Sequence, residues 1–155
     1  MPSVEGIRAI LGDLLGRGVT ATLGEPLPLE RDTPAIVADY ETDDGTLAVV
    51  VLSDLRLSNS LGAALTMVPA SAVEEAITRW QIDDANVENL REVVNIMTRL
   101  FNCDDTPHLK FRDVHRLPGD LPEETRAVLD EPLARRNLDI VVEEYGPGKL
   151  AVLCA

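Results

Sequence analysis

The chain has 155 residues, 45% of them hydrophobic and 3% aromatic, which suits one globular domain over residues 1–155 with an aliphatic core. Acidic residues outnumber basic ones by 27 to 14, and the net charge of −13 argues against nucleic acid and against an anionic membrane as partners. The opening Met1-Pro2-Ser3 leads into no secretory signal, and no apolar run is long enough to span a bilayer, so we expect a cytoplasmic protein. Without an export signal, Cys103 and Cys154 are expected to be two free structural thiols.

Helical and strand patterns alternate along the chain. In chain order, the predicted elements are a helix at 4–15, a strand at 19–23, a loop at 24–34, a hairpin at 35–41 and 46–52, a helix at 54–67, a helix ending near 80, a helix at 86–102, a strand after 107, a short helix at 123–129, and a closing hairpin at 137–145 and 149–153. This order predicts an α+β fold with a largely antiparallel or mixed sheet and long helices packed on it.

Short polar motifs mark the ends of these elements. Ser3 is the expected N-cap of the first helix, and Ser53 or Asp54 is the expected N-cap of the helix at 54–67. Ser71 and Glu74 have the spacing of a capping box for the following helix. Gly146-Pro147-Gly148 is the predicted turn of the closing hairpin.

The helix predicted at 86–102 has two distinct faces. Its apolar face consists of Val87, Leu90, Val93, Val94, Ile96, Met97, Leu100 and Phe101. The opposite face carries Glu88, Glu92, Asn95 and Arg99. Asparagine costs roughly half a kcal/mol relative to alanine inside a helix. Because Glu92 and Asn95 stand at i and i+3, they can act together on a partner that docks on the helix, although an ordinary solvated face is the alternative interpretation.

Familiar catalytic and metal-binding motifs are missing. The sequence has no glycine-rich phosphate loop, no Gly-x-Ser-x-Gly motif and no Cys-x-x-Cys pair. His108 and His115 have an odd separation, which on one strand places them on opposite faces, so we expect no shared metal. The acidic pairs Asp43-Asp44, Asp83-Asp84 and Asp104-Asp105 are expected in turns or at helix ends.

The motif Glu88-x-x-x-Glu92-x-x-Asn95, followed by 22 residues and then Pro118, resembles that of the CheX/CheC family of bacterial chemotaxis phosphatases. That family carries an acidic or serine residue, three residues, Glu, two residues, Asn, and a proline after about 22 more. The family usually has Asp or Ser in place of Glu88, so no role is carried over to Glu88. A small residue often follows the motif helix, where this chain has Arg99-Leu100. These departures leave open whether catalysis is retained.

The resemblance implies a protein phosphatase that dephosphorylates the phospho-aspartate of a CheY-like response regulator. Asn95 would be catalytic by positioning the attacking water, and Glu92 would contact the lysine that such receivers carry beside the phosphorylated aspartate. The Mg²⁺ would be supplied by the response regulator, and the chain would need no cofactor of its own. The helix at 54–67 lacks a Glu-x-x-Asn, and a single motif copy implies the CheX-like type, whose members are homodimers.

Two other classes of function remain open. The first is a non-catalytic receiver- or partner-binding module of the same fold in chemotaxis or two-component signalling. The second is an unrelated metabolic enzyme, which predicts a deep apolar pocket with converging polar groups. A phosphatase that acts on a protein should instead present Glu92 and Asn95 on an open helix surface.

Overall fold

The computed structural model describes residues 1–103 and 106–155, so the predicted turn at Asp104-Asp105 lies outside the described residues. In chain order, the elements are α1 (Val4–Leu15), β1 (Val19–Leu23), β2 (Ala35–Thr42), β3 (Leu47–Asp54), α2 (Leu55–Leu65), α3 (Ala70–Thr78), α4 (Asp84–Met97), the 3₁₀ turn η1 (Thr98–Leu100), β4 (Leu109–Leu117), α5 (Glu123–Asp130), β5 (Ala134–Val142) and β6 (Gly146–Cys154).

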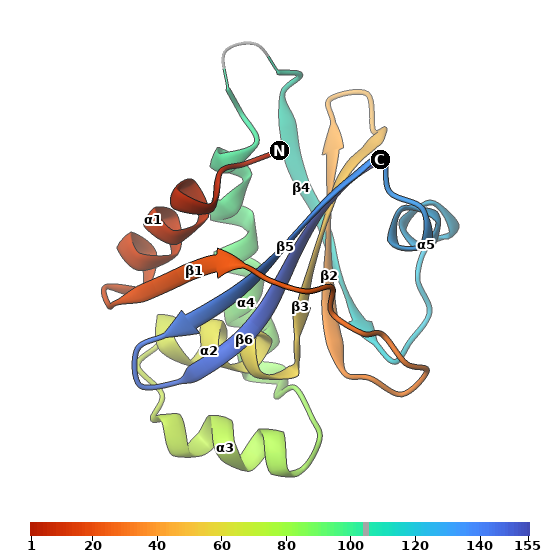
Figure 1. Ribbon diagram of the computed structural model, residues 1–155. Coiled ribbons are helices and arrows are strands. Elements are labelled where there is room, and N and C mark those ends of the chain that lie inside the picture. Colours follow the sequence, from red (N-terminus) through yellow and green to blue (C-terminus); the bar gives the residue numbers. More distant parts are fainter. Residues whose placement is uncertain (104–105) are drawn as a thin grey trace.

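The strands form one sheet of order β1-β5-β6-β3-β2-β4, and every neighbouring pair is antiparallel. Helices α1, α2 and α4 pack on one face of this sheet, and α5 covers part of the other face (Figure 1). The predicted α+β fold with an antiparallel sheet and helices packed on it is therefore confirmed.

Alternating side chains of the strands fill two cores, because successive residues of a strand point to opposite faces. The larger core lies beneath the three helices and includes Tyr40, Val51 and Ile140. The smaller core lies beneath α5 and includes Val37 and Val50 of neighbouring strands. The strand β3 contributes to both cores, as its nearly continuous apolar sequence indicates.

Several predicted element boundaries are confirmed by the hydrogen bonds at the ends of helices and strands. Ser3 Oγ accepts a hydrogen bond from the Gly6 N–H at 3.0 Å and caps α1. Of the two candidate caps of α2, Asp54 is the one used, since its Oδ1 accepts from the Leu57 N–H at 2.8 Å. In the turn of the β2–β3 hairpin, Gly45 has φ of 86°, a conformation that favours glycine.

The predicted capping box of α3 is wrong. The N-cap is Pro69, without a side-chain hydrogen bond, and Ser71 lies inside the first turn of the helix. The carboxylate of Glu74 instead forms an ion pair with Arg56 of α2. A partner from another helix has therefore replaced the local contact that the spacing indicated.

The predicted turn at Gly146-Pro147-Gly148 is also wrong. The chain reverses at 143–145, and Gly146 already pairs with Val142 as the first residue of β6. A Cβ on Gly148 would lie 2.7 Å from Cβ of Leu57 in α2. This glycine thus permits close packing of a helix on the sheet, which a local turn rule does not consider.

The long helix predicted at 86–102 is shorter at its C-terminal end. It begins at Asp84, two residues earlier than predicted, and the α-helical part ends at Met97 before the 3₁₀ turn. Its expected apolar side is nevertheless the side that packs, since Leu90, Val93 and Met97 are almost fully buried.

Candidate functional site

The helix α4 owes its orientation to an amphipathic sequence and to its acidic start. Its apolar stripe faces the larger core. Asp83 occupies the N-cap position without a side-chain cap bond, and Asp84 adds negative charge to the first turn. Both carboxylates lie where the helix dipole favours an anion.

A buried amide network holds the start of α4 against α2. Asn59 is fully buried in α2, and its Nδ2 donates to the carbonyls of Leu55 and Gln81, both at 3.0 Å. Its Oδ1 accepts from the Asp83 N–H at 3.1 Å and from Asn86 Nδ2 at 3.0 Å. All four hydrogen-bonding positions of one amide are thus used, and three of them join α2 to the start of α4 and the segment before it.

The backbones of the two helices come into close contact at Gly62 of α2. A Cβ at this position would lie 2.2 Å from the carbonyl oxygen of Asn86 and 2.7 Å from its Cα. Only glycine leaves room for the backbone of α4 here. The contact therefore sets how deeply α4 sits on α2.

Tyr40 holds the middle of α4 against the sheet. Its hydroxyl donates to the carbonyl oxygen of Val94 at 2.7 Å, next to Asn95 in the sequence. Burial raises the pKa of Tyr40 well above its ordinary value of 10.0, so the phenol remains a neutral donor. The ring packs edge-on against Phe101 and Phe111, with centroids 4.8 and 6.1 Å away. The helix is thereby fixed from below at the level of the predicted site.

Glu92 and Asn95 lie together on the outer face of α4, as predicted. Both side chains are exposed, and among the residues that the structure describes neither makes a side-chain hydrogen bond or an ion pair. One turn separates them, so their Cβ atoms stand about 5–6 Å apart. Glu88 and Arg99 extend the same exposed row in the two directions along the helix axis.

Polar neighbours on the flanks of α4 are already paired. Arg91 forms an ion pair with Asp113 of β4 at 2.9 Å. Asn89 Nδ2 donates to Thr66 Oγ1 at 3.1 Å. The outward-facing Glu92 and Asn95 are thus left available to a partner, while the side chains beside them fasten the helix to the domain.

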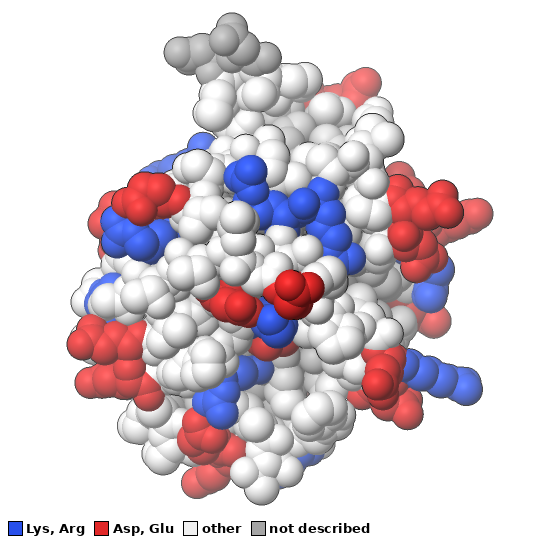
Figure 2. All heavy atoms as spheres, in the orientation of Figure 1, with Lys and Arg blue, Asp and Glu red and all other residues white. Residues whose placement is uncertain are grey.

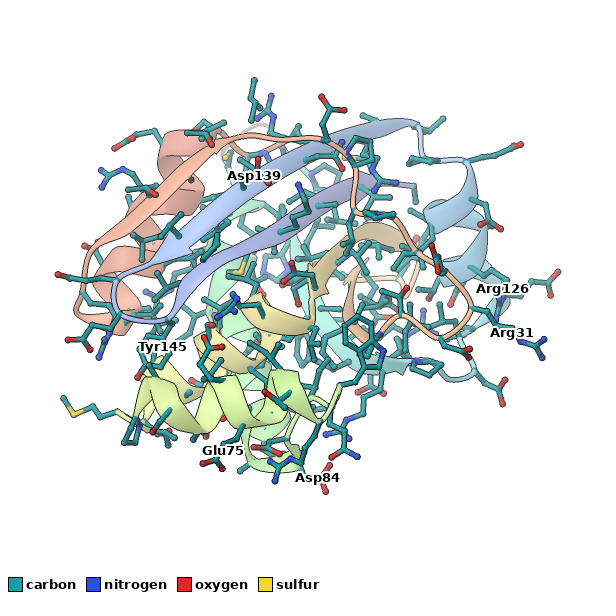
Figure 3. All side chains as sticks on the ribbon, turned by 60° about the horizontal axis from the view of Figure 1, so that its bottom comes forward. Arg31, Glu75, Asp84, Arg126, Asp139 and Tyr145 are labelled. Atoms are coloured by element: carbon teal, nitrogen blue, oxygen red, sulfur yellow. The ribbon has the colours of Figure 1, made fainter. Side chains whose placement is uncertain are left out.

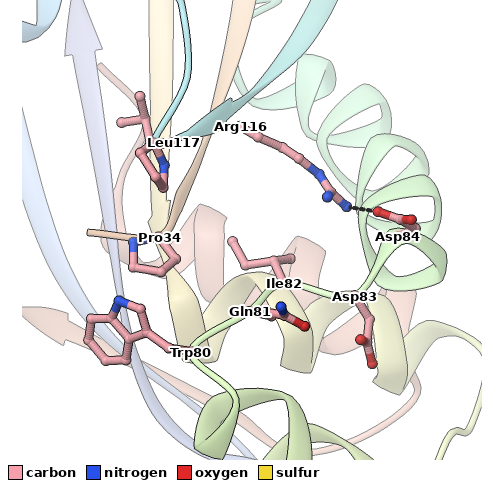
Figure 4. A pocket seen from close by; sticks show the side chains of 9 residues that line it. Pro34, Trp80, Gln81, Ile82, Asp83, Asp84, Arg116 and Leu117 are labelled. Carbon is pink, nitrogen blue, oxygen red and sulfur yellow. Dashed lines mark ion pairs between the residues drawn. The ribbon is translucent and has the colours of Figure 1, made fainter. Parts of the chain in front are cut away.

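Pro118 is not brought to this site. It follows β4 and lines a pocket of 420 Å³ with Trp80 and Asp84, where Arg116 Nη2 pairs with Asp84 at 2.6 Å (Figure 4). Asp84 precedes Asn95 by eleven residues, which corresponds to about 16 Å along a helix axis. Pro118, the proline of the motif, therefore lies near the N-terminal end of α4, whereas Asn95 lies near the C-terminal end.

A second cavity, of 500 Å³, lies at the C-terminal end of the same helix. Phe101 and Leu109 contribute to its lining, and Arg99 lies at the same cavity. Its residues do not include Glu92 or Asn95. The exposed pair therefore has the open setting expected for action on a macromolecule and does not line this apolar cavity.

The histidines do not meet. His108 precedes β4, so the two do not share a strand, contrary to what the prediction from their spacing assumed. His108 pairs with Asp43 at 3.0 Å, whereas His115 Nε2 bonds to the fully buried Asp39 at 2.8 Å. Thr125 Oγ1 donates to the same Asp39 carboxylate at 2.7 Å. Within residues 1–103 and 106–155, no group of three or more His, Cys, Asp or Glu side chains is placed to hold a metal ion.

Other features bear on the predictions of compartment and partner. Both cysteines have free thiols, but Cys103 is exposed and only Cys154 is partly buried. No helix in the described ranges has the length and apolarity that a bilayer crossing needs. On the face presented in Figure 2, a short row of basic side chains has acidic side chains on both sides of it and below it.

Sequence reasoning missed the residues that support α4. Asn59, Gly62 and Tyr40 act through contacts across the fold. Asn59 and Gly62 both meet Asn86, 27 and 24 residues away, and Tyr40 meets Val94, 54 residues away. A signal was present in the apolar helix at 54–67, because the run Ser58-Asn59-Ser60 is unusual for a segment that is buried.

Comparison with known proteins identifies the fold. No protein-family model matches the chain, and no curated protein matches it. FliY of Thermotoga maritima superposes with a TM-score of 0.62 at 15% identity, covering 96% of this chain and 82% of that one. A chain of the FliM–SpeE complex from H. pylori has a TM-score of 0.62 at 9% identity, with 97% and 80% covered. A chain of the CheX–CheY–BeF₃–Mg²⁺ complex from Borrelia burgdorferi has a TM-score of 0.55 at 6% identity, with 96% and 92% covered.

These similarities extend over nearly the whole chain, although few residues are identical. The protein has the fold that CheX shares with the FliY and FliM domains, and the resemblance drawn from the motif is confirmed at the level of fold. Because CheX and FliM domains have different partners in these structures, the fold alone does not assign an activity.

Proposed function

We propose that this protein is a phosphatase that removes the phosphoryl group from the phospho-aspartate of a CheY-like receiver docked on α4. The main support for this proposal is the pair Glu92 and Asn95. Both side chains are exposed, one turn apart, on a helix that Tyr40 and Asn59 hold in place. The CheX structure with a similar fold was determined with CheY, BeF₃ and Mg²⁺, which supports the same class of partner here.

Asn95 suits the role of orienting the attacking water. An acyl phosphate is already reactive, so the catalyst mainly has to place a water molecule in line with the bond that breaks. An amide offers both a donor and an acceptor to that water, and it needs no change of protonation state. The helix is held at the adjacent Val94 carbonyl, which limits the positions that the amide can take.

Glu92 suits the role of a docking residue with an effect on the rate. Its carboxylate is exposed and can form a charge-assisted hydrogen bond with the lysine beside the receiver's phosphorylated aspartate. Such a bond would hold Asn95 over the phosphorus atom. The Mg²⁺ that neutralises charge on the phosphoryl oxygens would be bound by the receiver.

The decay of a phosphorylated receiver tests this assignment. We expect wild type to shorten the lifetime of the aspartyl phosphate, and Asn95→Ala to reduce this acceleration by about 100-fold, the typical effect of losing one preorganised catalytic hydrogen-bonding group. Glu92→Ala should weaken receiver binding as well as the rate. Glu75→Ala, an exposed carboxylate on α3, is the matched control and should behave as wild type. Decay that is equally fast with Asn95→Ala would refute the role of Asn95.

The alternative is a non-catalytic module that binds a receiver or another partner. The structural similarity to FliM and FliY domains favours this alternative. The residues Glu88 and Arg99 favour it as well, because at these positions the chain departs from the phosphatase motif. This alternative predicts that α4 captures a receiver in a pull-down while the phosphate lifetime stays unchanged. Measuring binding and lifetime on the same sample separates the two functions.

An oligomeric state and a cellular compartment are proposed together with this function. We propose a homodimer, for which the edge strands β1 and β4 offer unpaired backbone groups. Light scattering on the purified chain should give twice the monomer mass. A phosphatase of CheY-like receivers would work in the cytoplasm, where such receivers reside.

A further inference from the structure

Three arginines from separate parts of the chain line one pocket on the side of the sheet opposite α4. Arg31 comes from the loop before β2, Arg126 from α5 and Arg135 from β5. Figure 3 shows Arg31 and Arg126 close together at the end of the molecule that carries α5. The pocket has a volume of 510 Å³, within the range of small-molecule sites.

These arginines differ from most others in the chain in having no carboxylate partner. Ion pairs are formed by Arg8, Arg17, Arg56, Arg79, Arg91, Arg112 and Arg116. Within the described residues, none of the three pocket arginines forms such a pair, although the chain has 27 acidic residues to choose from. Three unpaired guanidinium groups around one hollow are the arrangement that binds an anion.

The pocket is not purely basic, since Glu30 and Asp130 also line it. Three arginines and two carboxylates leave one positive charge in excess. Glu30, Asp130, Arg31 and Arg126 are all exposed, so water screens these four charges alike. Arg135 is half-buried, so its charge is screened less and acts more strongly inside the pocket.

Arg135 also has a hydrogen-bond donor without an acceptor. Its Nε donates to Asn137 Oδ1 at 2.7 Å, but its Nη2 is enclosed and has no partner within the described residues. An enclosed cationic N–H without an acceptor is costly, and such groups usually have a water, an ion or a ligand beside them. The Nη2 of Arg135 therefore still has a hydrogen bond to donate, either to water or to the anionic group of a ligand.

The remainder of the lining is aliphatic. It includes Leu27, Leu29, Leu117, Leu121 and Leu129. Polar atoms make up the larger part of the accessible lining of this pocket, and the leucines form a smaller apolar part beside them. An inorganic ion would leave this apolar part uncovered, whereas a ligand with an aliphatic body would bury it.

We propose that the pocket between α5, β5 and the loop before β2 binds a small amphipathic anion, a phosphate or carboxylate group attached to an aliphatic body. The anion lies between the guanidinium groups of Arg31 and Arg126, with Arg135 beneath it. The aliphatic body covers the leucines. This site is separate from Glu92 and Asn95, so ligand binding here does not depend on the phosphatase proposal.

Isothermal titration calorimetry with four probes tests the proposal: octyl phosphate, octanoate, octanol and inorganic phosphate, each below its aggregation limit. We expect octyl phosphate or octanoate to bind the full chain, and to bind about tenfold or more tightly than octanol or inorganic phosphate, because each of these two lacks one half of the ligand. The stronger of the first two probes identifies the anionic group. Binding should weaken as salt is raised.

Matched variants locate the binding. The double variant Arg31→Gln/Arg126→Gln should lower the affinity at least about tenfold, as expected for lost charged hydrogen bonds. Arg8→Gln removes an exposed arginine from α1 and should bind as wild type. Arg135→Gln is compared only after circular dichroism shows native folding, because its side chain is partly enclosed. The proposal fails if neither anionic probe binds, if octanol binds equally well, or if the double variant retains wild-type affinity.

Discussion

Replacing Asn59 with alanine should destabilise the domain strongly, because this amide is the centre of the contact between α2 and α4. The substitution removes the acceptor of two donors, the Asp83 N–H and the Asn86 side-chain amide. It also removes the donor that satisfies the carbonyl of Gln81. Asn86 is only 4% exposed, so water cannot readily replace the lost partner.

The size of the effect follows from the groups left unpaired. A buried donor without an acceptor costs about 1–3 kcal/mol. The Asn86 amide is buried and the Asp83 N–H is partly buried, so losing both bonds should lower the free energy of unfolding by about 3 kcal/mol. For a domain of this length, that corresponds to a melting temperature lower by roughly 6–12 °C. Urea unfolding followed by circular dichroism measures the change, with equal m-values required for the comparison.

Asn89→Ala is the matched control for this substitution. Asn89 also links α4 to the α2 side, through Thr66, but its hydrogen bond is exposed and water can take its place. We expect a change of about 0.5 kcal/mol or less. In the double variant Asn59→Ala/Asn86→Ala, the orphaned amide is gone, so the combined loss should be smaller than the sum by about 1 kcal/mol. A loss for Asn59→Ala equal to that of the control, or strictly additive losses, would refute the reasoning.

Three further substitutions address other parts of the molecule. Gly62→Ala should lower the free energy of unfolding by about 3 kcal/mol or more in urea unfolding, because its Cβ would lie 2.2 Å from the Asn86 carbonyl oxygen. Tyr40→Phe should cost about 1 kcal/mol and loosen α4, seen as faster amide exchange around Val94, whose carbonyl loses a 2.7 Å bond. Burial raises the pKa of Asp54 above 3.8, so the native state binds the proton more tightly than the unfolded state does. The contribution of Asp54 to the free energy of unfolding therefore falls as the pH rises through the raised pKa. Asp54→Asn should therefore flatten the pH dependence of the free energy of unfolding above pH 3.8, and an unchanged profile would contradict this.

Local rules succeeded where a residue's role is determined by its neighbours in the chain. The cap at Ser3, the turn at Gly45 and the exposed pair Glu92 and Asn95 depend on spacing within a few residues. The same rules failed at Glu74 and Gly148, because a side chain or backbone of α2 occupies the space beside each of them. Contacts between distant segments cannot be inferred from local spacing.

The sequence by itself determined the α+β composition, the apolar side of α4 and the two polar side chains on its outer face, because periodicity is a local property of the chain. Only the tertiary structure decided what holds that helix in place, since Asn59, Gly62 and Tyr40 meet it from segments far away in the sequence. The fold likewise gathers Arg31, Arg126 and Arg135 from three separate elements around one pocket. Convergence of this kind follows from chain packing, and no pattern of neighbouring residues encodes it.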